Sequence, residues 1–116
     1  KNIRVSLFIE PKINDVKIAK EVGTDCVELH TGNFCNLFNK KKNISKSYYR
    51  LKNSAKYAKK LGLEVHAGHG LTYKSAMMIS KIDQIVEFNI GHALIAESLF
   101  LGLTNTIKKF KKVINK

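Results

Sequence analysis

Hydrophobic residues recur along the chain in two periods, one typical of strands and one typical of helices. Runs of β-branched and aromatic residues that alternate with polar ones predict strands at residues 3–9, 26–30, 63–67 and 85–90. Helices are predicted from Asn14 or Asp15 to Gly23, from Ser45 or Ser47 to Leu61, from Thr72 through Ile79, over residues 93–101, and from Thr104 onward. In the first of these helices, Val16, Ala19 and Val22 are expected on one side. Residues 31–42 are predicted as a loop of about a dozen residues, longer than most connections.

A predicted helix follows a predicted strand four times, which favours a parallel sheet with helical crossovers. In an open doubly wound sheet the central strands are buried on both faces and are apolar throughout. These strands instead alternate. One face carries Val5, Leu7, Ile9, Val27, Leu29, Val65, Ala67, Val86, Phe88 and Ile90. The other carries Arg4, Ser6, Phe8, Glu28, His30, Glu64, His66, Glu87 and Asn89.

A sheet with one polar face fits a barrel, in which helices cover the apolar face and the polar face lines the lumen. Buried charges need partners, so Glu28, Glu64 and Glu87 are expected to be balanced by Arg4, His30 and His66. A complete (β/α)₈ barrel has eight strands and about 250 residues. The predicted α/β fold is therefore one half of a TIM barrel, because four strands occur in 116 residues.

Composition narrows the class further. Hydrophobic residues make up 44% and charged residues 26% of the chain, which excludes disordered and collagen-like classes. The sequence contains no run of about 18 apolar residues, so no membrane span is predicted. The net charge of +12 favours anionic partners, but only Arg4 and Arg50 are arginines, so solvated lysines are favoured over a nucleic-acid surface. Cys26 and Cys35 match no zinc spacing and are expected to be reduced thiols in a cytoplasmic protein.

All four histidines lie near the ends of predicted strands, close to glycines: His30, His66, His69 and His92. The carboxyl ends of parallel strands are where α/β barrels build their active sites. Glycines on both sides of His69 permit a tight turn, and imidazole suits proton transfer near neutral pH. A proton-transfer role is therefore predicted for His69, the alternative being a histidine that only hydrogen-bonds its turn.

The turn at Gly91 and His92 predicts an anion site, because free backbone N–H groups and the helix dipole attract phosphate at a helix N-terminus. A plain tight turn is the alternative. His30 and His66 have two interpretations. They are either ligands of a metal such as zinc or lumen residues that neutralise Glu28 and Glu64, and the second interpretation is favoured.

Four segments resemble the pyridoxine 5′-phosphate synthase family. They are RVSLFIE (residues 4–10), ELHTG (28–32), HAGHGLTY (66–73) and FNIGHALI (88–95). Their order and spacing are similar to those of the last four strands in that family, over the whole chain. The resemblance implies that residues 1–116 form the C-terminal half of a single TIM-barrel domain.

The resemblance also implies a function and an assembly. The family condenses 3-amino-2-oxopropyl phosphate with 1-deoxy-D-xylulose 5-phosphate to give pyridoxine 5′-phosphate, phosphate and water, in vitamin B6 biosynthesis. It uses no metal and no organic cofactor, and it is a cytoplasmic homo-octamer. His69 matches the proton donor. The positions that match the binding site of the aminoketone phosphate are Gly70, Gly91 and His92. Residues expected to line this site or support it from behind are Glu28, His30, Thr31 and His66.

One departure from the family is large. Its proton acceptors, a histidine and a glutamate, and its pentulose-phosphate site lie in the N-terminal half, which this sequence does not include. The chain alone is therefore expected to be inactive as a synthase. Two alternatives remain open: a metal-dependent TIM-barrel hydrolase that uses His30, His66 and His69, and a basic nucleic-acid-binding module. The favoured partners are the two phosphorylated substrates, with neither nucleic acid nor membrane.

Overall fold

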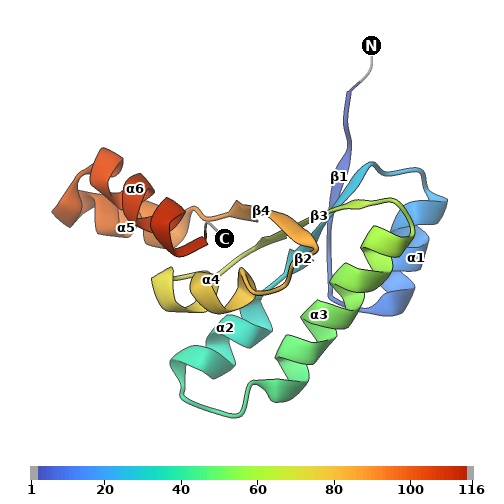
Figure 1. Cartoon of the computed structure of the whole chain (residues 1–116), viewed down its shortest axis with the longest axis horizontal. Coiled ribbons are helices and arrows are strands. Elements are labelled where there is room, and N and C mark those ends of the chain that lie inside the picture. The colour runs from blue at the N-terminus through green and yellow to red at the C-terminus, as the bar shows by residue number, and fades with distance from the viewer. Residues whose placement is uncertain (1–2, 115–116) are drawn as a thin grey trace.

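The computed structural model describes residues 3–114 and places four parallel strands in one sheet (Figure 1). The spatial order of the strands follows the chain, β1-β2-β3-β4. The strands are β1 (Ser6–Ile9), β2 (Cys26–His30), β3 (Glu64–Gly68) and β4 (Ile85–Asn89). The helices are α1 (Ile13–Glu21), α2 (Gly32–Asn39), α3 (Ser45–Lys60), α4 (Tyr73–Ile79), α5 (His92–Leu101) and α6 (Leu103–Ile114). The predicted α/β class and the parallel sheet with helical crossovers are confirmed.

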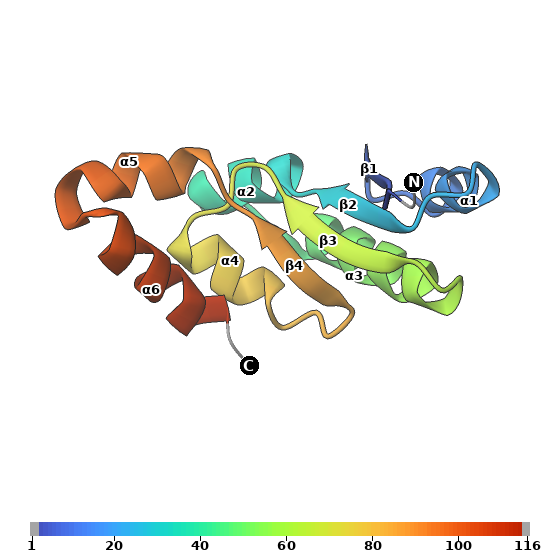
Figure 2. The same ribbon diagram turned by 90° about the horizontal axis from the view of Figure 1, so that it is seen from above.

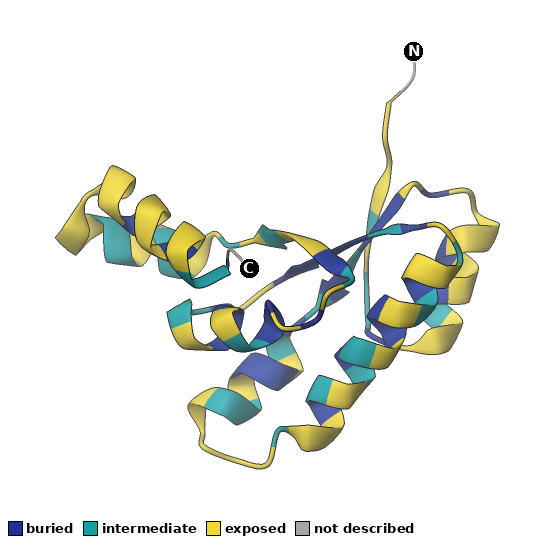
Figure 3. Ribbon diagram, viewed as in Figure 1, coloured by how far each residue is buried: buried dark blue, intermediate teal, exposed yellow. Residues whose placement is uncertain are grey.

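The core lies between one face of the sheet and the helices α1, α3 and α4, which lie on the same side of it (Figures 1 and 2). Strands β2 and β3 bury their alternate apolar residues almost completely, as predicted: Val27, Leu29, Val65 and Ala67. Figure 3 shows the buried residues concentrated on these strands and on the inner faces of the helices. Burying a side chain of this size stabilises a fold by about 1.5–3 kcal/mol, so this layer holds the sheet in place.

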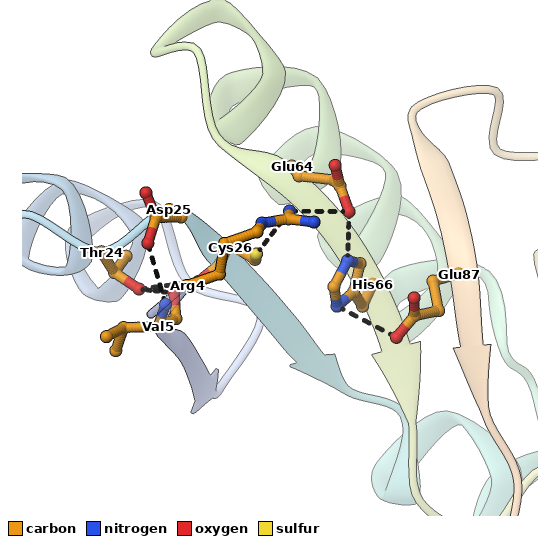
Figure 4. A network of polar contacts seen from close by, with 8 residues as sticks. All are labelled: Arg4, Val5, Thr24, Asp25, Cys26, Glu64, His66 and Glu87. Atoms are coloured by element: carbon orange, nitrogen blue, oxygen red, sulfur yellow. Dashed lines mark hydrogen bonds and ion pairs between the residues drawn. The ribbon is translucent and has the colours of Figure 1, made fainter. Parts of the chain in front are cut away.

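The opposite face of the sheet is polar, and no helix among residues 3–114 covers it (Figure 1). Toward the amino ends of the strands, charged groups pair with one another on this face (Figure 4). The Arg4 guanidinium lies 3.0 Å from Glu64, and His66 lies 2.8 Å from Glu64 and 3.5 Å from Glu87. The expected compensation of Glu64 and Glu87 by Arg4 and His66 is therefore confirmed.

Glu28 and His30 do not pair with these groups in the expected way. The amide of Asn89 donates a hydrogen bond of 2.8 Å to Glu28, and the ring of His30 contacts Glu10 at 2.6 Å. Both side chains lie nearer the carboxyl ends of the strands than the Glu64 network does. The expectation that His30 neutralises Glu28 is therefore wrong, because the register of the sheet brings each of them a closer partner.

The segment predicted as a loop at residues 31–42 contains a helix, α2. Phe34 and Cys35 on this helix are buried in the core, and Phe38 packs against the same cluster. The ring centroids of Phe34 and Phe38 lie 5.8 Å apart. The prediction was wrong because this helix is short and half of its residues are glycine or asparagine, so it depends on tertiary burial of its apolar side.

Three apolar residues predicted to be buried are exposed instead, and the first of them is Val5, which precedes β1 and is 48% exposed. Val22 follows the last turn of α1 and is 67% exposed. The pairing of β3 with β4 shifts register between Val65 and His66, which leaves Val86 of β4 without a partner in the ladder. Ile85 therefore takes the inward position, at 3% exposure, and Val86 is 60% exposed. One extra residue in a strand reverses the faces of the residues beside it, which the alternation of a single strand cannot reveal.

Helices α5 and α6 extend beyond the carboxyl end of β4, where α6 also packs against α4 (Figure 2). Gly102 separates them with φ of 76°, so α6 begins at Leu103, slightly earlier than the cap predicted at Thr104. Large apolar side chains of this pair are exposed, among them Leu99 and Phe100. Among the residues that the structure describes, no helix has the length and apolar character needed to cross a membrane.

Candidate active site

The carboxyl ends of the strands bring five of the predicted site residues together around one cavity of about 760 Å³. Its lining includes Glu28, His69, Gly70, Gly91 and His92. These residues come from β2, from the turn after β3 and from the start of α5. The chain separates them by up to 64 positions, but parallel strands bring their carboxyl ends to one edge of the sheet. The cavity therefore joins the predicted proton donor to the predicted phosphate turn.

The turn that carries His69 has an unusual backbone. His69 has φ of 80° and Gly70 has φ of 79°, in the left-handed region that side chains other than glycine rarely adopt. Thr31, which is fully buried, holds this turn from β2: its hydroxyl lies 2.7 Å from the carbonyl oxygens of both Gly68 and His69. Its backbone N–H also donates to Gly68. Thr31 thus stabilises a strained backbone that aims His69 at the cavity.

Replacing Thr31 by valine is expected to lower the free energy of unfolding by about 1–3 kcal/mol. Valine keeps the shape of threonine but removes the buried hydrogen bond to the carbonyl of Gly68 and the part-buried one to the carbonyl of His69. The matched variant Thr31→Ser keeps the hydroxyl and should retain most of the stability. Urea unfolding of the three proteins measures the difference. Equal stability of the valine variant and the unsubstituted protein would contradict this role.

The ring of His69 lies against two other rings at the mouth of the cavity. The His30 ring centroid is 4.7 Å away with the rings nearly perpendicular, and the Phe8 centroid is 6.3 Å away. Gly32 lies beneath both imidazoles, since a Cβ added there would be 2.7 Å from His30 Nε2 and 3.0 Å from His69 Cδ2. The two histidines also share the lining of a second hollow of about 440 Å³. The site therefore contains a pair of imidazoles in edge-to-face contact rather than an isolated histidine.

Glu10 completes this group and was not among the predicted site residues. Its Oε1 lies 2.6 Å from His30 Nδ1. The hydrogen bond from His30 holds the pKa of the Glu10 carboxyl below its usual range, and the positive charges of Lys12 and Arg50 act in the same direction. The sequence carries one usable signal: Glu10 is an acidic residue directly after the first strand, at the edge where the other site residues lie.

The predicted phosphate turn lies at the N-terminus of α5. Gly91 precedes the helix and His92 is its first residue. No acidic side chain lies in the first turn of this helix, so no carboxylate of that turn offsets the positive end of the helix dipole. A Cβ added to Gly91 would meet no atom within 4 Å, so the turn is open to the cavity. This geometry suits an anion.

Glu28 lies on the floor of the cavity, facing β3. Gly68 leaves room for its carboxylate, since a Cβ at Gly68 would collide with Glu28 Oε1. Asn89 on β4 holds the other carboxylate oxygen at 2.8 Å. The alternation of β4 predicted that Asn89 lies on the polar face. Its contact with Glu28 crosses β3 and has no sequence signal. Glu28 is thereby fixed where a ligand in the cavity would contact it.

His66, by contrast, lies away from this mouth and within the network at the amino ends of the strands. Within the described part of the chain, the one trio of candidate metal ligands with atoms inside 4.8 Å of one another is Cys26, Glu64 and His66. The Arg4 guanidinium already lies 3.0 Å from both Cys26 Sγ and Glu64 Oε1. Hydrogen bonds from His66 and Arg4 hold the pKa of Glu64 below its usual range.

This arrangement does not favour the metal alternative. His30, His66 and His69, which a metal-dependent hydrolase would use together, do not form a group of ligands in the described residues. The Cys26 trio has a cation of the protein in contact with two of its three members. His66 is therefore a residue that balances charge on the polar face, as the favoured interpretation holds.

The fold and the cavity define a class: parallel α/β proteins whose ligand site lies at the carboxyl ends of the strands. Comparison with known proteins identifies the family within that class. The family model of the pyridoxal phosphate biosynthesis protein PdxJ matches residues 1–116, and the chain belongs to this family.

Individual relatives agree with the family match. The chain is 53% identical over 116 residues to a pyridoxine 5′-phosphate synthase of Pelagibacter ubique (strain HTCC1062), and the aligned region covers 100% of this chain and 48% of that protein. It is 49% identical over 112 residues to the synthase of Sulfurihydrogenibium sp. (strain YO3AOP1), covering 97% of the chain and 45% of that protein. The chain thus spans about half the length of the curated relatives that it matches.

Proposed function

We propose that the chain provides the aminoketone-phosphate half of the active site of a pyridoxine 5′-phosphate synthase. The reaction joins 3-amino-2-oxopropyl phosphate and 1-deoxy-D-xylulose 5-phosphate into pyridoxine 5′-phosphate, with release of phosphate and water. The observation that carries the proposal is the single cavity in which His69 faces the same space as Gly91 and His92. Membership of the PdxJ family adds the substrate class to this geometry.

In this proposal the chain's residues bind one phosphate and move protons beside it. Backbone N–H groups at the start of α5 and the ring of His92 hold the phosphate of the aminoketone, and Gly70 lets the backbone approach it. His69 donates a proton to the reacting part of the substrate. Imine formation, dehydration and loss of phosphate are all steps that proton transfer accelerates. The proposal requires neither a metal nor an organic cofactor.

We also propose that residues 1–116 are the C-terminal half of a TIM barrel. Two features support this. Strands β1 and β4 pair with a neighbour on one side only in the described sheet, and unpaired edges are a liability. The polar face carries the paired charged groups of Glu64, His66 and Glu87, and this is the face that would line the lumen of a barrel. The family resemblance extends the proposal to a cytoplasmic homo-octamer, for which the mass of the assembled enzyme is the test.

A hybrid enzyme tests the proposed function. The segment of the Pelagibacter ubique synthase that aligns with this chain is replaced by residues 1–116, and formation of pyridoxine 5′-phosphate from the two substrates is measured. We expect turnover of the same order as that of the parent synthase. The chain without the rest of the barrel is expected to give none, because no proton acceptor for the pentulose phosphate is supplied. A folded hybrid that binds both substrates but forms no product would refute the proposal.

A further inference from the structure

Three titratable side chains follow one another at the carboxyl ends of the strands: Glu10 after β1, His30 at the end of β2 and His69 after β3. Glu10 Oε1 lies 2.6 Å from His30 Nδ1, and the His30 ring meets the His69 ring edge to face at 4.7 Å. Glu10 follows β1 and His69 follows β3, and β2, which carries His30, lies between those two strands. The order carboxylate, imidazole, imidazole is therefore continuous, and it ends at the predicted proton donor.

The contact with Glu10 determines which nitrogen of His30 carries a proton. An ionised carboxylate only accepts hydrogen bonds, so the short contact requires a proton on Nδ1. When His30 is neutral, Nε2 then has a free lone pair. This nitrogen lies over Gly32, beside the ring of His69, in the hollow that both histidines line. His30 thus presents a proton-accepting nitrogen to the same water-accessible space as His69.

We propose that Glu10 and His30 form a proton relay that reloads His69 between catalytic cycles. The inference deepens the proposed function and rests on it for the role of His69. After His69 has donated its proton and become neutral, an Nε2–H of charged His30 passes its proton to a ring nitrogen of His69, directly or through one water. His30 becomes neutral, keeps its Nδ1–H on Glu10 and takes a new proton on Nε2 from hydronium or the acid form of the buffer in the solvent. No group is oxidised or reduced.

The charged and titratable groups around the relay are compatible with this cycle. Lys12 and Arg50 lie near Glu10, and their positive charges help to keep its carboxylate ionised. Cys35 of α2 lines the shared hollow, and burial raises the pKa of its thiol, so it does not compete as a thiolate. Phe8 packs edge-on against the His30 ring at 5.0 Å and fixes its plane. His30 is a positioning and relay residue, because it acts through His69.

The first test needs no substrate. Glu10→Gln keeps the size of the side chain but can also donate, so it no longer requires a proton on Nδ1. In the chain labelled with ¹⁵N-histidine, NMR distinguishes the two tautomers of neutral His30, which is assigned with His30→Asn. We expect the Nδ1–H form to dominate in the unsubstituted chain and the Nε2–H form to gain population in Glu10→Gln. An unchanged tautomer distribution would overturn the inference, even if the hybrid enzyme proves inactive.

The second test separates a relay from simple packing. In the hybrid enzyme, Glu10→Gln and His30→Asn are expected to lower kcat by at least about tenfold, with little change in KM for the aminoketone phosphate. Added imidazole should restore part of the lost rate in His30→Asn, because an external acid can reload His69. Glu10→Asp should retain more activity than Glu10→Gln. A loss that imidazole does not relieve would indicate a structural role and refute the relay.

Glu87→Gln is the matched control. Glu87 also contacts a histidine, since His66 Nδ1 lies 3.5 Å from it, but this pair belongs to the network toward the amino ends of the strands (Figure 4). The same chemical change there should leave kcat and the response to imidazole unchanged. If Glu87→Gln reduced kcat as strongly as Glu10→Gln, the effect would come from the charge of the polar face and not from the relay.

Discussion

His69→Asn in the hybrid enzyme is expected to lower kcat by about 10²–10⁴-fold, the usual contribution of general acid catalysis. Asparagine is the appropriate replacement because His69 has φ of 80°, and asparagine tolerates this left-handed backbone better than most residues. The backbone of the turn and its contacts with Thr31 should therefore survive. Binding of the aminoketone phosphate, which the start of α5 provides in the proposed function, should change little. Steady-state kinetics and phosphate-analogue binding measure the two effects separately.

His66→Asn provides a matched control for this prediction. His66 is another strand-borne histidine, but its contacts are Glu64 and Glu87 in the network at the amino ends of the strands. Removing it should destabilise the fold and leave turnover per folded molecule close to that of the hybrid. If both substitutions reduced kcat equally, or if His69→Asn retained nearly full turnover, His69 would not be the proton donor.

The general architecture could be predicted because it rests on local patterns. Alternation in β2 and β3 identified the buried face, since the apolar residues there pack into one core cluster with residues of the helices. The convergence of His69 with Gly91 and His92 was also predictable. Parallel strands place all their carboxyl ends at one edge, so residues after different strands must meet there whatever the loops between them do.

Contacts set by register could not be predicted. Glu10 reaches His30 across a strand pair, 20 positions away in the chain, and Asn89 reaches Glu28 over 61 positions. Such pairs depend on which residue of one strand lies beside which residue of the next, and a single strand contains no information on this. The shift of register that turns Val86 outward is the same kind of feature.

The helix α2 was missed for a related reason. Its eight residues include Gly32 and three asparagines, all poor helix formers, so local propensity argues against it. It forms because Phe34 and Cys35 are buried beneath it and Thr31 ties its start to β3. Residues of this helix line the second hollow together with His30 and His69.

Gly70→Ala is expected to lower both stability and turnover. Gly70 has φ of 79°, where a side chain costs about 1–2 kcal/mol. The new Cβ would also lie 3.2 Å from the Cβ of buried Cys35, so Cys35 or the turn must move by a few tenths of an ångström to relieve the contact. Movement of the turn displaces His69, its neighbour, and a misplacement of about 1 Å can reduce a rate about 10²-fold. Urea unfolding and kcat of the hybrid are the two measurements.

Gly62→Ala separates strain from displacement. Gly62 has φ of 77°, close to that of Gly70, and lies just before β3 where Gly70 lies just after it. A Cβ at Gly62 meets no atom within 4 Å, so only the conformational cost applies. This variant should lose about as much stability from strain as Gly70→Ala does and keep its turnover. Equal turnover in the two variants would mean that the turn can shift without moving His69, and that the catalytic geometry does not depend on the glycine beside it.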